Sequence, residues 1–317
     1  MLSLDLIRQA RDRIRGRVHR TPLVSSATLS QELGARVSLK LECLQKTGSF
    51  KPRGAFNKLL TLSDDERRRG VVAVSGGNHA QGVAYAAREL GVRAVLCMPK
   101  STPANYLDAT RGYGAEIALC DDIRSAFARV EELRGQGLTL VHPFDDPLVA
   151  AGQGTIGLEI PEDAPEATHV YVSIGGGGLL AGVATALHAL KPGVEVVGVE
   201  TVGADAMAKA LAAGEPVELP AITSIARTLG APRVSQFTLD HVRKLAREVV
   251  VVTDAEAVDA LVLLLERAKV LTEPAAACCL AAARRHRFAP TDHVVLLLCG
   301  GNSSLDDVCA WRAPRQG

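Results

Sequence analysis

The stretch "HVYVSIGGGGLLAGVATALHAL", His169–Leu190, decides the fold class of this chain. It begins as a short β-branched apolar run, passes through four consecutive glycines and continues as an alanine- and leucine-rich segment typical of a helix. The same order of strand, glycine turn and helix occurs in "GVVAVSGGNHAQGVAYAAREL", Gly70–Leu90. Elsewhere, "RAVLCMP" and "VEVVGVE" are predicted strands, and "ANYLDATRGYG" is a predicted helix. Continuous apolar strands joined by helices predict an α/β fold with parallel sheets covered by helices on both faces.

The composition excludes several classes of protein. The 317 residues are 47% hydrophobic and 22% charged, which is enough for a large core. A formal net charge of +1 and 3% aromatic residues give no basis for a nucleic-acid partner. No apolar run approaches the roughly 18 residues of a transmembrane helix, so no membrane association is expected, and the opening segment is amphipathic rather than a signal peptide. The seven cysteines lack CxxC spacing and are expected to be reduced thiols in a cytoplasmic protein.

The four glycines of the opening stretch predict a phosphate-binding loop. Their backbone N–H groups are not obstructed by side chains, and the partial positive charge at a helix N-terminus favours an anion. A tight turn without a ligand is the plainer alternative. Gly176, Gly178 and Ala181 also fit the dinucleotide fingerprint G-x-G-x-x-G/A, with Glu200 placed as a ribose-binding acid, so a nicotinamide-dependent oxidoreductase stays open. No Gly-Lys-Ser/Thr follows the loop, which excludes a Walker A motif.

Two further glycine turns follow predicted strands. In "VSGGNHAQG", Val74–Gly82, the backbone N–H groups from Ser75 to His79 are suited to hold a carboxylate at a helix start. His79 itself is more often a helix-start residue than a catalyst. In "LLLCGGN", Leu296–Asn302, the thiol of Cys299 follows a buried strand. Ligands bind at such strand ends in open parallel sheets, although a core cysteine is the plainer alternative.

A lysine stands before a proline in "KTGSFKPRGAF", Lys46–Phe56, at an expected helix start. A lysine is rarely buried without a partner, and burial lowers its pKa, which makes the amine a nucleophile and a base. A surface lysine is equally compatible with this stretch alone. Together, however, Lys51, the glycine loop and a polar group at a strand end are the parts of a pyridoxal-phosphate site. They supply an anchor for the aldehyde, a phosphate site and a partner for the ring nitrogen.

The whole chain resembles the fold-type-II pyridoxal-phosphate enzymes of the serine/threonine dehydratase and serine racemase group, whose fold is like that of the tryptophan synthase β subunit. The resemblance rests on "HRTPL", "KLECLQKTGSFKPRGAFNKL", "SGGNHAQGVAYAA", "HPFDDPLVAAGQGTIGLEI", "SIGGGGLLAG", "KVLTEPAAA" and "LLCGGN". It implies two parallel-sheet-based domains with the active site between them. Residues 1–65 plus 146–317 are expected to form the large cofactor-binding domain, and residues 66–145 the small inserted domain.

The resemblance also implies roles for individual residues. Lys51 forms the Schiff base with the cofactor and acts as the general base. The other implied cofactor contacts are Phe50 at the ring, Asn78 at the 3'-oxygen, Gly175, Gly176, Gly177, Gly178 and Leu179 at the phosphate, and Cys299 at the pyridine nitrogen. The implied site for the substrate carboxylate is Ser75, Gly76, Gly77, Asn78 and His79. Glu273 lies beside the cofactor in relatives, with a helix-start acid as the alternative.

The expected reaction is α,β-elimination from L-serine or L-threonine, which gives pyruvate or 2-oxobutyrate and ammonia. A thiol at Cys299, unlike a carboxylate, does not stabilise a protonated pyridinium, and this favours loss of the β-hydroxyl over a long-lived carbanion. Three alternatives stay open: a serine racemase of the same fold, the nicotinamide-dependent oxidoreductase and a non-catalytic ligand-binding module. In the racemases of this family, a serine that acts as the second acid/base group stands where this chain has Gly76. The resemblance further implies a homodimer and a cation near Glu200, Ala204 and Ala206. K⁺ suits that site better than a divalent cation, because an alanine offers only its carbonyl.

Overall fold

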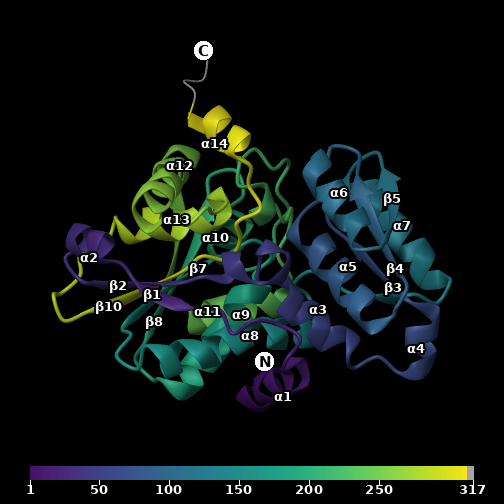
Figure 1. The fold of residues 1–317 in the computed structure, drawn as a ribbon, viewed down its shortest axis with the longest axis horizontal. Helices are drawn as coiled ribbons and strands as arrows, with labels where there is room; N and C mark the ends of the chain where they lie inside the picture. Colours follow the sequence, from purple (N-terminus) through teal and green to yellow (C-terminus); the bar gives the residue numbers. More distant parts are fainter. Residues whose placement is uncertain (313–317) are drawn as a thin grey trace.

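Two separate sheets organise this protein in the computed structural model, which describes residues 1–312 (Figure 1). The larger sheet has six strands in the order β1-β2-β10-β7-β8-β9. Its strands are β1 (Leu23–Ser25), β2 (Arg36–Lys40), β7 (His169–Ser173), β8 (Glu195–Thr201), β9 (Glu248–Val252) and β10 (His293–Leu297). β1 pairs antiparallel with β2, and every other neighbouring pair is parallel. The larger sheet is therefore mixed, with a parallel centre.

The smaller sheet has four strands in the order β5-β4-β3-β6, and all of its pairs are parallel. Its strands are β3 (Val71–Val74), β4 (Ala94–Pro99), β5 (Glu116–Cys120) and β6 (Thr139–Leu140). Alternate residues of β3 face opposite sides: Val71 and Ala73 pack with the helix after β3, while Val72 and Val74 pack with the helix after β5. Both faces are thus apolar, as parallel strands require. These strands lie within the predicted range 66–145, whose limits stay a prediction.

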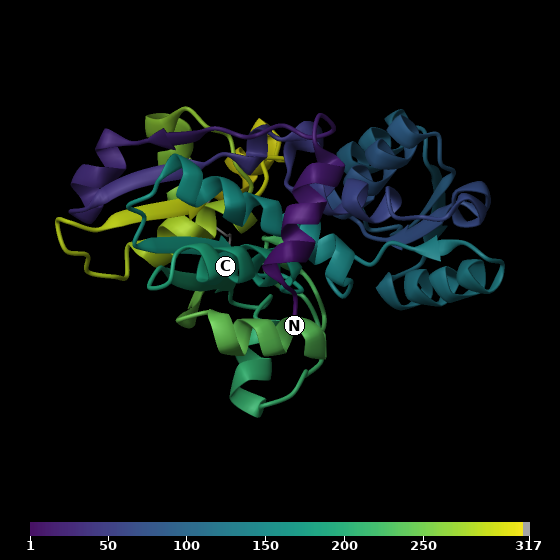
Figure 2. The same ribbon diagram turned by 90° about the horizontal axis from the view of Figure 1, so that it is seen from below.

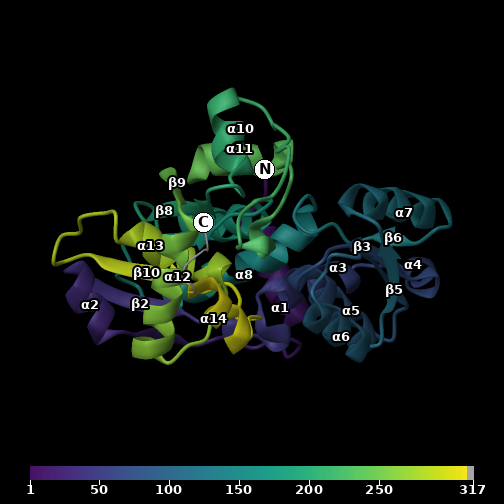
Figure 3. The same cartoon turned by 90° about the horizontal axis from the view of Figure 1, so that it is seen from above.

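Helices cover both sheets. They are α1 (Leu4–Ile14), α2 (Ala27–Leu33), α3 (Lys51–Leu59), α4 (Asp64–Arg69), α5 (Asn78–Leu90), α6 (Ala104–Gly112), α7 (Ile123–Gly135), α8 (Pro147–Asp163), α9 (Gly178–Leu190), α10 (Ala206–Ala213), α11 (Gln236–Leu245), α12 (Asp254–Leu263), α13 (Pro274–Ala283) and α14 (Leu305–Arg312). In Figure 1, α13 lies on one face of the larger sheet and α8 with α9 on the other. Figure 2 shows α1 lying where the two sheet-based units meet, and Figure 3 shows α10 and α11 standing away from the smaller sheet. Among residues 1–312, no helix combines the length and apolar character needed to cross a bilayer.

The elements that the sequence predicts are present. The opening stretch forms β7 and α9, and its counterpart forms β3 and α5. The predicted strands are β4 and β8, and the predicted helix is α6. In both units a glycine turn joins the carboxyl end of a strand to the start of a helix. The α/β fold class is confirmed, and the two glycine turns of the predicted site lie at these strand ends.

Candidate active site

Lys51 is the first residue of α3, and the chain just before it is held against the segment that follows β10. Phe50 N donates a hydrogen bond to Cys299 O at 3.1 Å, and an isolated β-bridge joins Ser49 to Gly300. These contacts join residues that lie almost the whole chain apart. The predicted lysine anchor and the predicted thiol therefore lie at the same edge of the larger sheet.

The amine of Lys51 is enclosed by protein groups. Its Nζ donates a hydrogen bond to Pro143 O at 3.2 Å and lies 5.0 Å from the centre of the Phe50 ring. Burial lowers the pKa of Lys51 to about 8, although the nearby Cys299 and Glu273 side chains act to raise it. Burial dominates because an ammonium loses its hydration inside the protein. A lysine with this pKa has a much larger neutral, nucleophilic fraction at physiological pH than an exposed lysine has.

Cys299 belongs to a cluster of buried thiols around the hydroxyl of Ser173, the last residue of β7. Ser173 Oγ lies 3.8 Å from Cys299 Sγ, 3.7 Å from Cys278 Sγ and 3.2 Å from Cys279 Sγ. Burial raises the pKa of the Cys299 thiol well above its ordinary value. Cys299 is therefore an uncharged thiol. Ser173 leads directly into the glycine loop, and Cys299 follows β10, which is the neighbour of β7 in the sheet. The Cys299 thiol and the glycine loop therefore lie at the ends of neighbouring strands.

The glycine loop between β7 and α9 packs tightly against Phe144. A Cβ added at Gly176 would lie 2.0 Å from a carbon of the Phe144 ring, and one added at Gly178 would lie 2.9 Å from Phe144 Cα. Gly177 has a φ of +94°, in the left-handed region that favours glycine. A Cβ added at Gly175 would lie 3.2 Å from the backbone of Leu229. Packing alone thus requires glycine in this loop, a reason that the sequence pattern did not reveal.

Asn78 is held by side-chain hydrogen bonds at the start of α5. Its Nδ2 donates to Glu273 Oε1 at 2.8 Å, and its Oδ1 accepts from Asn302 Nδ2 at 2.8 Å. Tyr106 OH, from α6, donates to Asn302 O at 2.9 Å and links this group to the smaller unit. Burial raises the pKa of Glu273 to about 7, against hydrogen bonds from Thr228 and Asn78 that lower it. Sequence reasoning missed both Asn302, although it ends the quoted "LLCGGN", and Tyr106.

The turn from Ser75 to His79 forms the junction between β3 and α5, as predicted. Ser75 Oγ accepts a hydrogen bond from Gly77 N at 3.0 Å, which fixes the turn. The imidazole of His79 points into the protein, where its Nε2 lies 2.8 Å from Val141 O. Burial and the charge of the nearby Lys51 lower the pKa of His79 to about 3. The ring is therefore neutral, and only the backbone of His79 is suited to the predicted carboxylate site.

Several buried hydroxyls around this turn and around Lys51 have no hydrogen-bond partner among the described residues. They belong to Thr47, Ser49, Thr102 and Thr272. Thr102, which the sequence gave no reason to single out, faces Gly76: a Cβ added at Gly76 would lie 2.8 Å from Thr102 Oγ1. Buried polar groups in proteins are normally satisfied, so unpartnered hydroxyls gathered in one region indicate a binding site for a polar ligand.

Comparison with known proteins identifies the family of this chain. Residues 14–300 match the profile of the family described as "Pyridoxal-phosphate dependent enzyme". The chain belongs to this family. The L-threonine ammonia-lyase of Thermotoga maritima is 42% identical over 306 residues, which are 95% of this chain and 76% of that protein. The L-threonine dehydratase catabolic TdcB of Escherichia coli K12 is 38% identical over 312 residues, 97% of this chain and 95% of that protein.

Solved structures agree with the family assignment. Maize serine racemase matches with a TM-score of 0.93 at 36% identity, over 98% of this chain and 96% of that one. The predicted membership of the fold-type-II dehydratase and racemase group is confirmed. The nicotinamide-dependent alternative is left without support, since the profile covers the glycine loop on which it depended.

The residues of this pyridoxal-phosphate dependent enzyme fit its cofactor. The first main-chain bond of the α9 region runs from Ala181 N to Gly177 O at 2.9 Å. Among residues 1–312, the N–H groups from Gly175 to Leu179 donate no hydrogen bond within the chain, so they are available to a phosphate at the positive end of a helix dipole. The roles of individual residues toward the cofactor stay predictions, and Lys51 has the chemistry to hold the aldehyde.

The predicted cation ligands of the enzyme lie where β8 leads into α10. Glu200 is fully buried, and its carboxylate accepts hydrogen bonds from Met207 N at 2.9 Å and Ala208 N at 2.8 Å. Burial raises the pKa of Glu200 to about 8, against these two bonds. Ala204 lies between β8 and α10, and Ala206 is the first residue of α10. Glu200 thus accepts hydrogen bonds from the start of α10, which the sequence did not indicate.

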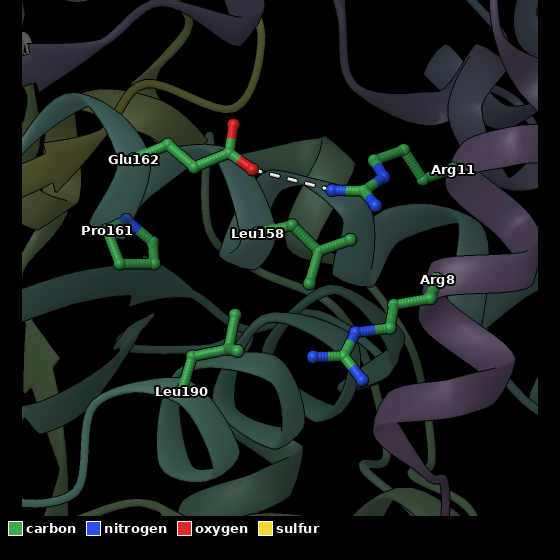
Figure 4. A pocket seen from close by; sticks show the side chains of 6 residues that line it. All are labelled: Arg8, Arg11, Leu158, Pro161, Glu162 and Leu190. Carbon is green, nitrogen blue, oxygen red and sulfur yellow. Dashed lines mark hydrogen bonds and ion pairs between the residues drawn. The ribbon is translucent and has the colours of Figure 1, made fainter.

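A surface hollow of the enzyme lies apart from all of these residues, between α1, α8 and the end of α9 (Figure 4). Its lining residues are Arg8, Arg11, Leu158, Pro161, Glu162 and Leu190. Arg11 Nη1 lies 3.4 Å from Glu162 Oε1 across the hollow. It contains none of the predicted site residues, and we assign it no part in catalysis.

Proposed function

We propose that this protein is an ammonia-lyase that converts L-threonine and L-serine to a 2-oxo acid and ammonia. The observation that carries the proposal is the enclosed amine of Lys51, which burial brings to a pKa of about 8 beside Cys299 and Glu273. The curated relatives described above support the same activity, because their names specify L-threonine as the substrate of a lyase or dehydratase.

Lys51 has two roles in this proposal. It is the residue that would hold the aldehyde of pyridoxal phosphate, which when bound supplies an electron sink for charge developing at an amino acid's α-carbon. The neutral Nζ of Lys51 also acts as a general base and takes the proton from the α-carbon of the substrate. A base works best when its pKa lies near the working pH, and a buried lysine meets that condition whereas an exposed one does not.

Cys299 favours elimination over reactions that need a long-lived carbanion. Its thiol is uncharged, because burial raises its pKa, and an uncharged thiol does not hold a proton on a pyridine nitrogen as a carboxylate would. Asn78 has one Nδ2 hydrogen engaged with Glu273 and a second one available for the cofactor's 3'-oxygen. Phe50, whose ring lies beside the Lys51 amine, is proposed to pack against the cofactor ring.

Serine racemisation is the second candidate, because the solved racemase has nearly the same fold. Racemisation requires a second acid/base group, on the opposite face of the planar intermediate from Lys51. Gly76 has no side chain to provide one, which favours the lyase. The two activities separate in a single assay that measures 2-oxo acid and D-serine together.

The test uses the cofactor-loaded protein with L-threonine and L-serine, and compares it with two lysine variants of α3. Lys51→Ala is expected to abolish 2-oxo-acid formation, since the anchor and the base are lost together. Lys58→Ala is the matched control, because its amine pairs with Asp146 at 2.8 Å and serves the structure only. Turnover by Lys51→Ala above a hundredth of the wild-type rate would refute the proposal, as would D-serine formed as fast as pyruvate.

Three finer proposals accompany the activity. K⁺ near Glu200 would stabilise a carboxylate whose pKa burial raises to about 8, with carbonyls of Ala204 and Ala206 as the other ligands. A thermal midpoint that rises in KCl but not in an equal concentration of choline chloride supports this cation. The protein is proposed to be a homodimer, which sedimentation equilibrium tests. It is also proposed to be cytoplasmic, in keeping with its free cysteines, and cell fractionation tests this.

A further inference from the structure

Thr102 carries a buried hydroxyl with no partner in the described chain. The residue lies in the loop between β4 and α6 and is 8% exposed. Its N–H donates to Pro99 O at 3.0 Å, so the turn is fixed, but its Oγ1 has no hydrogen-bond partner. Folded proteins rarely leave such a group unpaired. The hydroxyl is therefore positioned for a partner that the chain itself does not supply.

The hydroxyl faces the turn after β3. Because β3 and β4 are parallel neighbours, the loops at their carboxyl ends meet at one edge of the smaller sheet. A Cβ at Gly76 would lie 2.8 Å from Thr102 Oγ1, and the next nearest atom, Pro99 Cδ, would be 3.7 Å away. Thr102 Oγ1 thus lies close to Gly76, a residue of the turn that has no side chain.

The backbone of the turn after β3 has N–H groups that are free to donate. Gly77 N bonds Ser75 Oγ, and Ala80 N bonds Gly77 O at 3.1 Å. Within the described residues, the N–H groups of Gly76, Asn78 and His79 donate to nothing, and the last two open a helix of 13 residues. A ligand that only accepts hydrogen bonds and carries negative charge fits these groups best. The α-carboxylate of an amino acid has both properties.

We infer that Thr102 Oγ1 donates a hydrogen bond to the α-carboxylate of the substrate, beside the N–H groups of the Ser75–His79 turn. The inference rests on the proposed function, which supplies an amino acid as the substrate. It assigns substrate binding to a second loop, contributed by β4. The absence of a side chain at Gly76 is consistent with this contact, because a Cβ there would lie 2.8 Å from Thr102 Oγ1 and would crowd the hydroxyl.

The test replaces the hydroxyl by a methyl group of nearly the same shape. Thr102→Val is expected to raise the Kd of the holoenzyme for L-alanine about tenfold, which is the typical loss of one hydrogen bond to a charged group. L-Alanine has a carboxylate but no leaving group, and its binding is read from the absorbance of the bound cofactor. The KM for L-threonine rises by a similar factor, while kcat changes less than about threefold.

Two further variants serve as controls. Thr102→Ser keeps the hydroxyl and is expected to retain the wild-type Kd within about threefold. Thr110→Val removes an equally buried hydroxyl from the same helix region, where Oγ1 donates to Tyr106 O at 2.7 Å, and it leaves the Kd unchanged. Thermal midpoints are compared so that misfolded variants are recognised; Thr102→Ala replaces the valine variant if that one does not fold.

The outcomes are distinguishable from a failure of the proposed function. An unchanged Kd for L-alanine in Thr102→Val overturns the inference. A raised KM for L-threonine with unchanged L-alanine binding also overturns it, because the hydroxyl would then contact the leaving group. If no hydroxy amino acid is turned over, the proposed function fails, yet a tenfold weaker binding of L-alanine still supports a carboxylate contact from Thr102.

Discussion

Replacing Arg53 by methionine should destabilise this protein severely and in a pH-dependent way. Arg53 stands two residues after Lys51 on α3 and is 1% exposed. Its guanidinium donates to both oxygens of Glu42, at 2.8 and 2.9 Å, and to both oxygens of Glu159, at 2.7 and 3.0 Å. Lys40 Nζ, also fully buried, donates to Glu159 Oε2 at 2.6 Å. The four side chains form a balanced set of two positive and two negative charges.

The magnitude follows from the charge that the substitution leaves behind. Lys40 continues to pair with Glu159, but Glu42 keeps the Thr21 hydroxyl as a hydrogen-bond donor and loses its ion pair, in a position with no exposed surface. Removing one partner of a buried ion pair typically costs about 3 to 5 kcal/mol. The double variant Arg53→Met with Glu42→Gln removes the unpaired charge as well, and it is expected to recover about 2 kcal/mol of that loss.

The pH dependence has a definite sign. Burial raises the pKa of Glu42, but the charge and hydrogen bonds of Arg53, together with Thr21 and Lys40, lower it by more, so its pKa lies below the ordinary value. The ionised carboxylate therefore stabilises the wild-type fold at neutral pH, and this contribution is lost as pH falls through that lowered pKa. Without Arg53, the pKa of Glu42 is expected to rise, because burial is then opposed only by Thr21 and Lys40. The deficit of Arg53→Met is then larger at about pH 8 than at about pH 5.

Urea titration of each variant, with the free energy of unfolding measured at both pH values, decides the matter. Arg20→Met is the matched control, because Arg20 also bridges two carboxylates, those of Glu162 and Asp163, but is about half exposed. A surface pair of that kind contributes about 1 kcal/mol or less. A loss below about 1 kcal/mol in Arg53→Met, or an equal loss at both pH values, would refute the reasoning.

Three other predictions concern catalysis. The kcat of the enzyme should rise through a midpoint near pH 8, because burial lowers the pKa of Lys51 to about 8 and the neutral amine is the base; a profile that is flat from about pH 6 to 9 would contradict this. Gly176→Ala should weaken pyridoxal-phosphate binding at least about tenfold, since its Cβ would lie 2.0 Å from the Phe144 ring, and adding Phe144→Ala should restore part of the affinity measured by fluorescence titration. Gly76→Ser should increase D-serine relative to pyruvate only when it is combined with Thr102→Ala, because a Cβ at Gly76 would lie 2.8 Å from Thr102 Oγ1. Chiral chromatography measures this ratio. If the single variant forms as much D-serine as the double variant, Thr102 does not occupy this space.

The parts of the site that the sequence predicted are those coded by local patterns. A β-branched run, a glycine turn and an alanine-rich run specify β7 with α9 and β3 with α5, because periodicity and turn chemistry act over a few residues. Lys51 and Cys299 were assigned to one site from chemistry and resemblance, and the bond from Phe50 N to Cys299 O now places their segments side by side.

The parts that the sequence did not predict depend on contacts between distant segments. Phe144 lies in a turn, where an aromatic residue has no periodic signature, yet it determines why Gly176 is a glycine. Thr102 becomes informative only because β3 and β4 are neighbours in the sheet. Glu200 is the last residue but one of β8, a position that suggested a ligand site, and its bonds to the start of α10 could not be inferred from sequence spacing alone.

The position of β10 determines when an active enzyme can exist. β10 is the last strand among residues 1–312, yet it lies between β2 and β7 in the larger sheet, in yellow between much earlier segments (Figure 1). While a ribosome is still making the chain, β2 and β7 emerge before the strand that joins them, and Lys51 does not yet have Cys299 beside it. Nascent domains can fold as they emerge, but a sheet whose central strand comes last cannot close early. Each molecule therefore becomes able to take up its cofactor only after β10 has been made.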